Sequence, residues 1–255
     1  MLMDRKTLKL PFTIGHVPDW MCPSCGKGVL RVKKESFFTA ERAHSRHYRG
    51  HPEWEPTWID NVYSCLLYCT NDKCKEVVAL SGSGSVDYSV GEDEHGEPEQ
   101  ICEDYYRPKY FDPPLRLIAI PSSCPKSVSE PIGESFSLFF ASPSAAANNI
   151  RVGIEQLLTE LKIKRFNSVK GKRRFINLHI RITLLPSQYS GIKDLIFAIK
   201  WLGNSGSHSG ESIGMDDVMD AYEFLEHILE EIYGKKAKKL KALAKKVNKK
   251  KGPIK

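Results

Sequence analysis

The sequence of 255 residues lacks any long apolar run. Its longest stretch without a charged side chain, Ser135–Ile150, is rich in serine and asparagine and contains Pro143. A membrane-spanning helix, by contrast, needs about 20 mostly apolar residues. The N-terminal sequence MLMDRKTLKLPF also lacks the apolar core of a secretory signal. We therefore expect a cytoplasmic protein with no membrane partner.

Acidic residues are missing from the segment Lys235–Lys255, which holds eleven lysines. The whole chain has a formal net charge of +7, so residues 1–234 carry −4. The excess positive charge therefore belongs to one lysine-rich tail. Such a tail is attracted to phosphate groups in a salt-dependent way. It could equally be a solvated, partly helical segment, since a lysine run carries no sequence specificity.

Seven cysteines are present, and their clustering in a cytoplasmic protein favours metal or redox chemistry over disulfides. Cys22 and Cys25 are separated by two residues and followed by a glycine, and Cys69 and Cys74 are separated by four residues. Two such turns on hairpins form a zinc ribbon with one tetrahedral ion. We expect a structural Zn²⁺, because four thiolates leave no open position for water.

The spacing between the two cysteine pairs leaves an alternative open. Forty-three residues separate Cys25 from Cys69, against about 15–20 in a compact ribbon. The four cysteines could therefore be unrelated reduced thiols. Cys65 lies in a strand-like run and is interpreted as a buried thiol rather than a ligand. A redox role for Cys22 and Cys25 is not favoured, because a second cysteine pair is available to share a metal.

The segment between the cysteine pairs is rich in histidine and aromatic residues, namely His44, His47, His51, Trp54 and Trp58. The three histidines could form a second metal site, although no carboxylate at helical spacing accompanies them. Alternatively, the segment is a basic, aromatic surface for nucleic acid or a partner, or it packs against the ribbon.

Changes in composition divide the chain into four parts. We expect a zinc-ribbon domain with a His- and aromatic-rich insertion over residues 1–104, a proline-rich linker over 105–125, a helical bundle over 126–234 and a lysine-rich tail over 235–255. Within the first part, glycine and proline predict a turn at Gly82–Ser85 and a mobile loop at Glu92–Asp104.

Beyond the linker, apolar residues recur every three or four positions, which predicts helices. Ile163–Arg174 is basic and contains glycine, so we expect a loop there. Ile176–Leu184 alternates as a strand does, yet we expect a helix ending at Pro186, since a lone strand would have no partner. The expected fold class is α+β, with a small N-terminal β zinc ribbon followed by an all-α helical bundle.

The segment Ile199–His208 carries a candidate phosphate-binding motif. Asn204 and His208 are four residues apart, so on a helix they share one face. Gly203 is a poor residue for a helix interior and suggests a close backbone approach. The asparagine and histidine could together bind a phosphate and move a proton. Alternatively, Asn204 caps the helix and His208 bonds to a neighbouring helix.

Three stretches give the segment Ser127–Tyr233 a family resemblance. NIRVGIE at 149–155, LHIRI at 178–182 and the Ala198–His208 motif resemble the bacterial domain-of-unknown-function family numbered 4145. A cysteine ribbon commonly precedes the domain in that family. The family in turn resembles the HEPN superfamily of four-to-five-helix bundles, many of which are metal-independent ribonucleases of toxin–antitoxin, CRISPR and phage-defence systems. The resemblance therefore implies an HEPN-like helical bundle.

The resemblance also implies a composite site. The superfamily motif consists of an arginine, a polar residue that is usually asparagine, and a histidine a few residues later, and two protomers pair around one cleft. Asn204 and His208 match the last two positions, whereas Gly203 stands in place of the arginine and Lys200 is the nearest cation. Lysine cannot offer a bidentate guanidinium to a phosphate.

Two residues of a preceding helix complete the expected site. The resemblance implies that Glu155, with a catalytic role, and Arg151, with a nucleic-acid-binding role, line the same cleft. Their spacing of four residues also suits a simple salt bridge.

We expect an RNA-cleaving or RNA-binding effector of a bacterial toxin–antitoxin or phage-defence system, leaning toward a metal-independent endoribonuclease. His208 acts as general acid or base, and Asn204 orients it or the phosphate. Lys200 and the loop cations Lys170, Lys172, Arg173 and Arg174 hold the RNA backbone. The expected partners are RNA or another nucleic acid, a second copy of the chain and an operon-encoded protein. The alternative is a non-catalytic dimerisation module that binds nucleic acid or protein.

Overall fold

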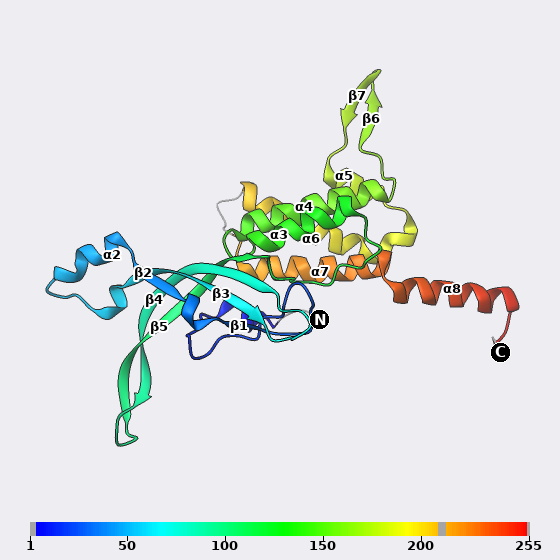
Figure 1. Ribbon diagram of the computed structural model, residues 1–255. Helices are drawn as coiled ribbons and strands as arrows, with labels where there is room; N and C mark the ends of the chain where they lie inside the picture. Colours follow the sequence, from blue (N-terminus) through cyan, green and yellow to red (C-terminus); the bar gives the residue numbers. More distant parts are fainter. Residues whose placement is uncertain (1–3, 209–212, 254–255) are drawn as a thin grey trace. The chain divides into compact units, whose positions relative to one another are not determined.

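The computed structural model describes residues 4–208 and 213–253, apart from the side chains of residues 205–208, 235–238 and 241 (Figure 1). The chain divides into an N-terminal unit that ends at Arg116 and a C-terminal unit that begins at Leu117. Among the described residues, every helix is too short or too polar to cross a bilayer.

The N-terminal unit is built on one antiparallel sheet that curls along its length (Figure 1). Its strands are β1 (Leu30–Val32), β2 (Phe38–Glu41), β3 (Asp60–Cys69), β4 (Val77–Glu92) and β5 (Pro98–Asp112). The order is β1-β3-β4-β5, and β2 pairs with the other end of β3. Short helices complete the unit: α1 (Arg5–Lys9), η1 (Lys34–Ser36), α2 (Ala43–His47), η2 (Tyr48–Gly50) and η3 (Pro56–Trp58). Buried and exposed residues alternate along β3, as they do in a strand with one face on a core.

The buried face of the sheet carries an aromatic core. Tyr63 and Tyr106 lie with ring centroids 5.0 Å apart, and Phe12 contacts both rings. Gly82 and Gly84 of β4 lie beneath these rings. A Cβ at Gly82 would come within 2.8 Å of the Tyr63 ring, and one at Gly84 within 3.1 Å of the Tyr106 ring. The expected turn at Gly82–Ser85 is therefore wrong. Gly82 also lies against the Arg107 carbonyl of β5, which an added Cβ would meet first. These glycines occupy the middle of a strand because the neighbouring backbone and the rings need the space.

The expected fold class is wrong for the N-terminal unit, which is a five-stranded curled sheet and not a small ribbon. Strands β4 and β5 stay paired as far as Glu92 and Pro98, so most of the expected mobile loop is strand. β5 also contains Pro108, beside a shift in register between Ser81 and Gly82. Proline is tolerated there because β5 is an edge strand and lies next to a bulge. The proline-rich stretch becomes irregular only after Asp112.

The C-terminal unit is mainly helical. Its helices are α3 (Lys126–Leu138), α4 (Pro143–Glu160), α5 (Leu178–Thr183), η4 (Ser187–Tyr189), α6 (Ser190–His208), α7 (Met215–Tyr233) and α8 (Lys235–Lys250). Helix α4 contacts α3, α6 and α7, and Ile150, Leu157 and Leu225 are fully buried in the core. The helix predicted for the alternating segment is confirmed over Leu178–Thr183. The Asn177 side chain caps it by accepting a hydrogen bond from the Ile180 N–H at 2.9 Å.

The expected all-α bundle is also wrong, because a β-hairpin interrupts the helices. Strands β6 (Phe166–Val169) and β7 (Lys172–Phe175) pair where a loop was expected, and the hairpin stands out from the helices in Figure 1. Lys170 and Gly171 both have positive φ, 51° and 72°, which is the backbone that a two-residue hairpin turn requires. The signal was weak because lysine, rather than asparagine, precedes the glycine.

Candidate metal centre and cationic cavity

Four cysteines meet in the N-terminal unit. The sulfur atoms of Cys22, Cys25, Cys69 and Cys74 all lie within 4.8 Å of one another. Two pairs are closer, with Sγ–Sγ distances of 3.8 Å between Cys22 and Cys74 and 3.7 Å between Cys25 and Cys69. In the part of the chain that the structure describes, this is the one group of histidine, cysteine or acidic side chains arranged to hold a metal ion.

Strand pairing explains why the two cysteine pairs can meet although 43 residues separate them. β1 follows the first pair and aligns directly with the end of β3, so that Leu30 lies opposite Cys69. The intervening residues include α2 and also β2, which pairs with the other end of β3, and they do not separate the two ends. The pairing of β1 with β3 therefore brings the two cysteine-bearing turns next to each other.

Hydrogen bonds from N–H groups surround the sulfur atoms. The Gly28 N–H donates to Cys25 Sγ at 3.5 Å, and the Asn71 N–H donates to Cys69 Sγ at 3.4 Å. The first of these bonds is the main reason that the pKa of Cys25 falls to about 6, whereas burial raises the pKa of Cys69 to about 12. N–H donors favour the thiolate form, which is the form that ligates metals.

Gly28 closes the cluster sterically. A Cβ at this position would lie 2.6 Å from Cys69 Sγ and 2.8 Å from the Asn71 nitrogen. Cys65, which lies four residues before Cys69 on β3, is outside the cluster. Burial raises the pKa of the Cys65 thiol to about 11, so it remains a neutral, buried thiol.

The histidines of the insertion do not gather into a metal group. His44 Nε2 lies 3.2 Å from the Asp60 carboxylate, and the His51 ring packs against Trp58 with centroids 5.5 Å apart. Arg49 instead forms an ion pair with Glu41 at 2.7 Å. The insertion is thus held by ion pairs and ring contacts.

The C-terminal unit contains a cavity of about 370 Å³ formed by α4, β7, α5 and α6. It is lined by Arg151, Glu155, Phe175, Asn177, Leu178, His179, Lys200 and Asn204. Four residues expected from the sequence, Arg151, Glu155, Lys200 and Asn204, are among them. The hairpin cations do not line the cavity, but Phe175 belongs both to its lining and to β7.

Arg151 is held in place by neighbouring side chains. Its guanidinium donates to Glu155 Oε1 at 2.6 Å and to Asn148 Oδ1 at 3.0 Å. Its aliphatic stem lies against Gly203 of α6, where an added Cβ would come within 3.0 Å of Arg151 Cβ. The Arg151 side chain thus passes Gly203 and lines the cavity.

Lys200 is a second cation of the cavity, and only 8% of its surface is exposed. Burial lowers its pKa, because a charged amine is less stable away from water. Its ammonium group lies 3.2 Å from the centroid of the neighbouring Trp201 ring, a cation–π contact that compensates part of that loss.

Sequence reasoning missed two residues of this region. His179, whose ring packs against Phe197 with centroids 5.1 Å apart, brings an imidazole to the cavity. Arg181 is buried behind it and donates to the Glu155 carbonyl at 3.0 Å and to Thr159 Oγ1 at 2.9 Å. The only sequence signal for either was their place in the LHIRI stretch.

The hairpin beside the cavity is strongly basic. Residues 162–175 contain seven cations and no acid. Lys170, Lys172, Arg173 and Arg174 are all exposed, and the Arg173 guanidinium lies 3.7 Å from the centroid of the Phe166 ring. The hairpin therefore presents cations and aromatic rings together to solvent.

His208 is the last residue of α6, one turn beyond Asn204. Its side chain lies outside the described residues, so the expected pairing of Asn204 with His208 is not tested.

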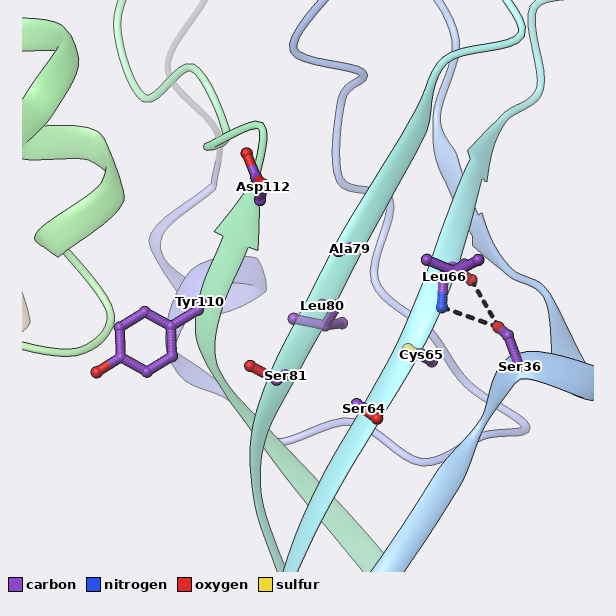
Figure 2. Close-up of a pocket in the computed structure, with 9 residues that line it drawn as sticks. All are labelled: Ser36, Ser64, Cys65, Leu66, Ala79, Leu80, Ser81, Tyr110 and Asp112. Atoms are coloured by element: carbon purple, nitrogen blue, oxygen red, sulfur yellow. Dashed lines mark hydrogen bonds between the residues drawn. The ribbon is translucent and has the colours of Figure 1, made fainter.

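A second cavity of about 290 Å³ lies on the exposed side of the curled sheet (Figure 2). Ser36 closes one side of it, accepting a hydrogen bond from the Leu66 N–H at 2.8 Å. Tyr110 and Asp112 of β5 line the other side, and Asp112 is the one charged residue of the lining. A cavity lined by a carboxylate and no cation is unsuited to phosphate, so the cationic cavity is the candidate nucleic-acid site.

Both units match family models of undefined function. Residues 10–111 match the model described as Domain of unknown function (DUF8608). Residues 133–250 match the model described as Domain of unknown function (DUF4145), so the resemblance of the C-terminal part to the family numbered 4145 is supported. No curated protein and no solved structure matches the chain.

Proposed function

We propose that the C-terminal unit binds RNA in the cationic cavity and cleaves it without a catalytic metal. The observation that carries this proposal is that Arg151, Lys200 and Asn204 line one cavity next to the basic hairpin. Two cations and an amide in one cavity suit the non-bridging oxygens of a phosphodiester. The hairpin cations and Phe166 suit an RNA strand that leads to the cavity.

The proposed reaction is an attack of the ribose 2′-oxygen on the adjacent phosphorus. The 2′-O–P bond forms and the P–O5′ bond breaks, leaving a 2′,3′-cyclic phosphate and a free 5′-hydroxyl. One imidazole accepts the 2′-hydroxyl proton and a protonated group delivers a proton to O5′. His208 takes one of these roles, since imidazole titrates near neutral pH. His179 is placed to take the other.

The remaining groups hold the phosphate and each other. Arg151 takes the place of the motif arginine, since this chain has Gly203 at that position. It offers the planar guanidinium that lysine does not. Glu155 holds Arg151 at 2.6 Å and is thereby a positioning residue. Lys200 balances the charge that builds up on the phosphate.

The resemblance to metal-independent ribonucleases supports the reaction class. With it comes the proposal of a symmetric homodimer whose two motifs face one cleft, and of an operon-encoded protein partner in toxin–antitoxin or phage defence.

The four-cysteine cluster is proposed to hold one structural Zn²⁺. A tetrahedral ion with Zn–S bonds of about 2.3 Å places its sulfur ligands about 3.8 Å apart. The two short Sγ–Sγ distances, 3.8 and 3.7 Å, fit that edge. Zinc would fasten the turn before β1 to the end of β3, and its four ligands leave no position for catalysis.

One observation favours a second function, a module that binds nucleic acid without cleaving it. Glu155 and Asn148 already engage the Arg151 guanidinium, so less of its charge is free for a transition state. Such a module would still need the cations of the cavity and hairpin.

The test compares wild type with His208→Ala and Arg151→Ala on a synthetic single-stranded RNA. Cleavage should survive EDTA, yield 2′,3′-cyclic phosphate ends, and fall about 10²–10⁴-fold in His208→Ala. The matched control is Lys193→Ala, which lies on α6 together with His208 but does not line the cavity. If wild type binds the RNA without cleaving it, even when an operon-encoded partner is added, the result would exclude the ribonuclease and support the binding module.

A further inference from the structure

Helix α8 has two chemically different faces. Leu240, Leu243 and Val247 are 56%, 52% and 38% exposed, so these apolar side chains are not packed against the helical unit. Counting about 100° per residue, the three fall within about 60° of one another on the helix surface. They form one stripe, which we call the α8 stripe.

From Lys239 to Lys250, lysine is the commonest residue outside the stripe. Lys239, Lys245, Lys246, Lys249 and Lys250 are all exposed, and none falls on the stripe by the same count. Acidic residues are absent from the α8 sequence. The helix is therefore strongly amphipathic although its overall composition is polar.

The helix is also set apart from the one before it. Gly234 has an extended backbone, with φ −63° and ψ 142°, so α7 ends there and α8 begins as a separate helix that extends beyond the other helices of the unit (Figure 1). A Cβ at Gly234 would overlap the Glu230 carbonyl and carboxylate, so the break depends on glycine. This geometry leaves both faces of α8 accessible.

We propose that α8 lies along the surface of an anionic lipid bilayer, with the α8 stripe inserted among the acyl chains. A basic helix with a narrow apolar face and low overall hydrophobicity is the form that binds at the interface of a membrane. Anionic headgroups attract the lysines, and the acyl region takes up the stripe, so one surface satisfies both faces.

Other occupants satisfy only one face. Nucleic acid neutralises the lysines but leaves three exposed apolar side chains in water. A second copy of α8 would cover the stripe but would bring lysines against lysines, which repel. The proposal departs from the expectation of no membrane partner, because that expectation rests on the lack of a spanning helix and an interfacial helix needs no spanning length.

The test is sedimentation of the full chain with vesicles of phosphatidylcholine alone or mixed with phosphatidylglycerol. Only the mixed vesicles should bind the protein, and added salt should weaken the binding. A Leu240→Gln, Leu243→Gln, Val247→Gln variant keeps every lysine and should lose at least about tenfold in vesicle affinity, since each lost apolar contact lowers insertion. Replacing one lysine by glutamine should cost about fivefold.

Controls keep the result specific. Leu10→Gln, Val90→Gln, Leu184→Gln makes the same three kinds of substitution at exposed apolar residues elsewhere and should bind as wild type. Circular dichroism checks that the α8 variant stays folded. Equal binding of the α8 variant and wild type to mixed vesicles overturns the proposal. So does a loss that appears instead in RNA affinity or in dimer mass, which would assign the stripe to nucleic acid or to a second copy.

Discussion

The Arg151 side chain of α4 lies across Gly203 of α6, and a Cβ on the glycine would come within 3.0 Å of Arg151 Cβ and 3.2 Å of Cδ. The two positions are 52 residues apart in the sequence. Gly203 precedes Asn204 and has no side chain, so it leaves room for Arg151 of α4 to line the cavity.

Gly203→Ala should displace Arg151 and weaken RNA binding by roughly 10- to 100-fold, the range for loss of a charge-assisted hydrogen bond of about 1.5–3 kcal/mol. The free energy of unfolding should change little, since alanine improves helix propensity by up to about 1 kcal/mol while the contact becomes crowded. Gly191→Ala on the same helix meets nothing within 4 Å and serves as the control. Equal RNA affinities in the two variants would contradict the role of the Arg151–Gly203 contact.

Glu155→Gln should tighten RNA binding severalfold, because it removes a negative charge from the cavity while leaving Arg151. The cost in unfolding free energy should stay below about 1 kcal/mol, as for a partly exposed ion pair. Fluorescence anisotropy and cleavage rates measured together separate the roles. A fall in cleavage of more than about 100-fold with binding retained would make Glu155 a catalytic residue.

A variant carrying Cys22→Ser and Cys25→Ser should purify without metal and unfold at a lower temperature, since a structural site contributes directly to folding. Wild type should contain about one zinc ion per chain and release it as the pH falls, because protons compete for the thiolates. Elemental analysis measures both. Cys65→Ser is the matched control, and loss of metal from it would place Cys65 among the ligands.

Gly28→Ala should lower metal affinity while keeping all four thiols. The new methyl group would lie 2.6 Å from Cys69 Sγ, so either the sulfur or the turn must move. Competition with a chromophoric chelator reports the affinity. Gly50→Ala, which meets nothing within 4 Å, should behave as wild type, and equal affinities for both variants would remove the steric argument.

A quadruple change of Lys170, Lys172, Arg173 and Arg174 to glutamine should weaken RNA binding and flatten its salt dependence. Each lost contact with a single strand lowers the slope of log affinity against log salt by about 0.7. The fold should be unaffected because all four side chains are exposed. Titrations at several salt concentrations check this, and an unchanged slope would exclude the hairpin from the interface.

The sequence was most informative where the chemistry is local. Two cysteine pairs with turn residues between them predicted the cluster, and β1–β3 pairing made the distance between the pairs irrelevant. The capped helix at Leu178–Thr183 was predicted from the lack of a partner strand. The spacing within each cysteine pair and the Asn177 cap are short-range features, whereas the pairing of β1 with β3 is a long-range one.

Prediction failed where a residue serves a distant contact. The sequence predicts a turn at Gly82, yet this glycine makes room for the Arg107 carbonyl and the Tyr63 ring on the two neighbouring strands. Pro108 was interpreted as part of a linker, yet it fits an edge strand beside a bulge. The cavity shows the same limit: Arg151 and Lys200 come from different helices, and the packing of α4 against α6, which includes the Arg151–Gly203 contact, brings them together.

The pairing of both β1 and β2 with β3 has a consequence for the segment between β2 and β3. Residues 42–59 begin and end at paired strands, so their ends are fixed whatever their length, and lengthening a closed loop costs little extra entropy. A protease that cut once within this segment would leave two fragments still joined along the strands and through the four cysteines. Such a nicked protein should migrate as one species under native conditions and separate into two when denatured with a chelator.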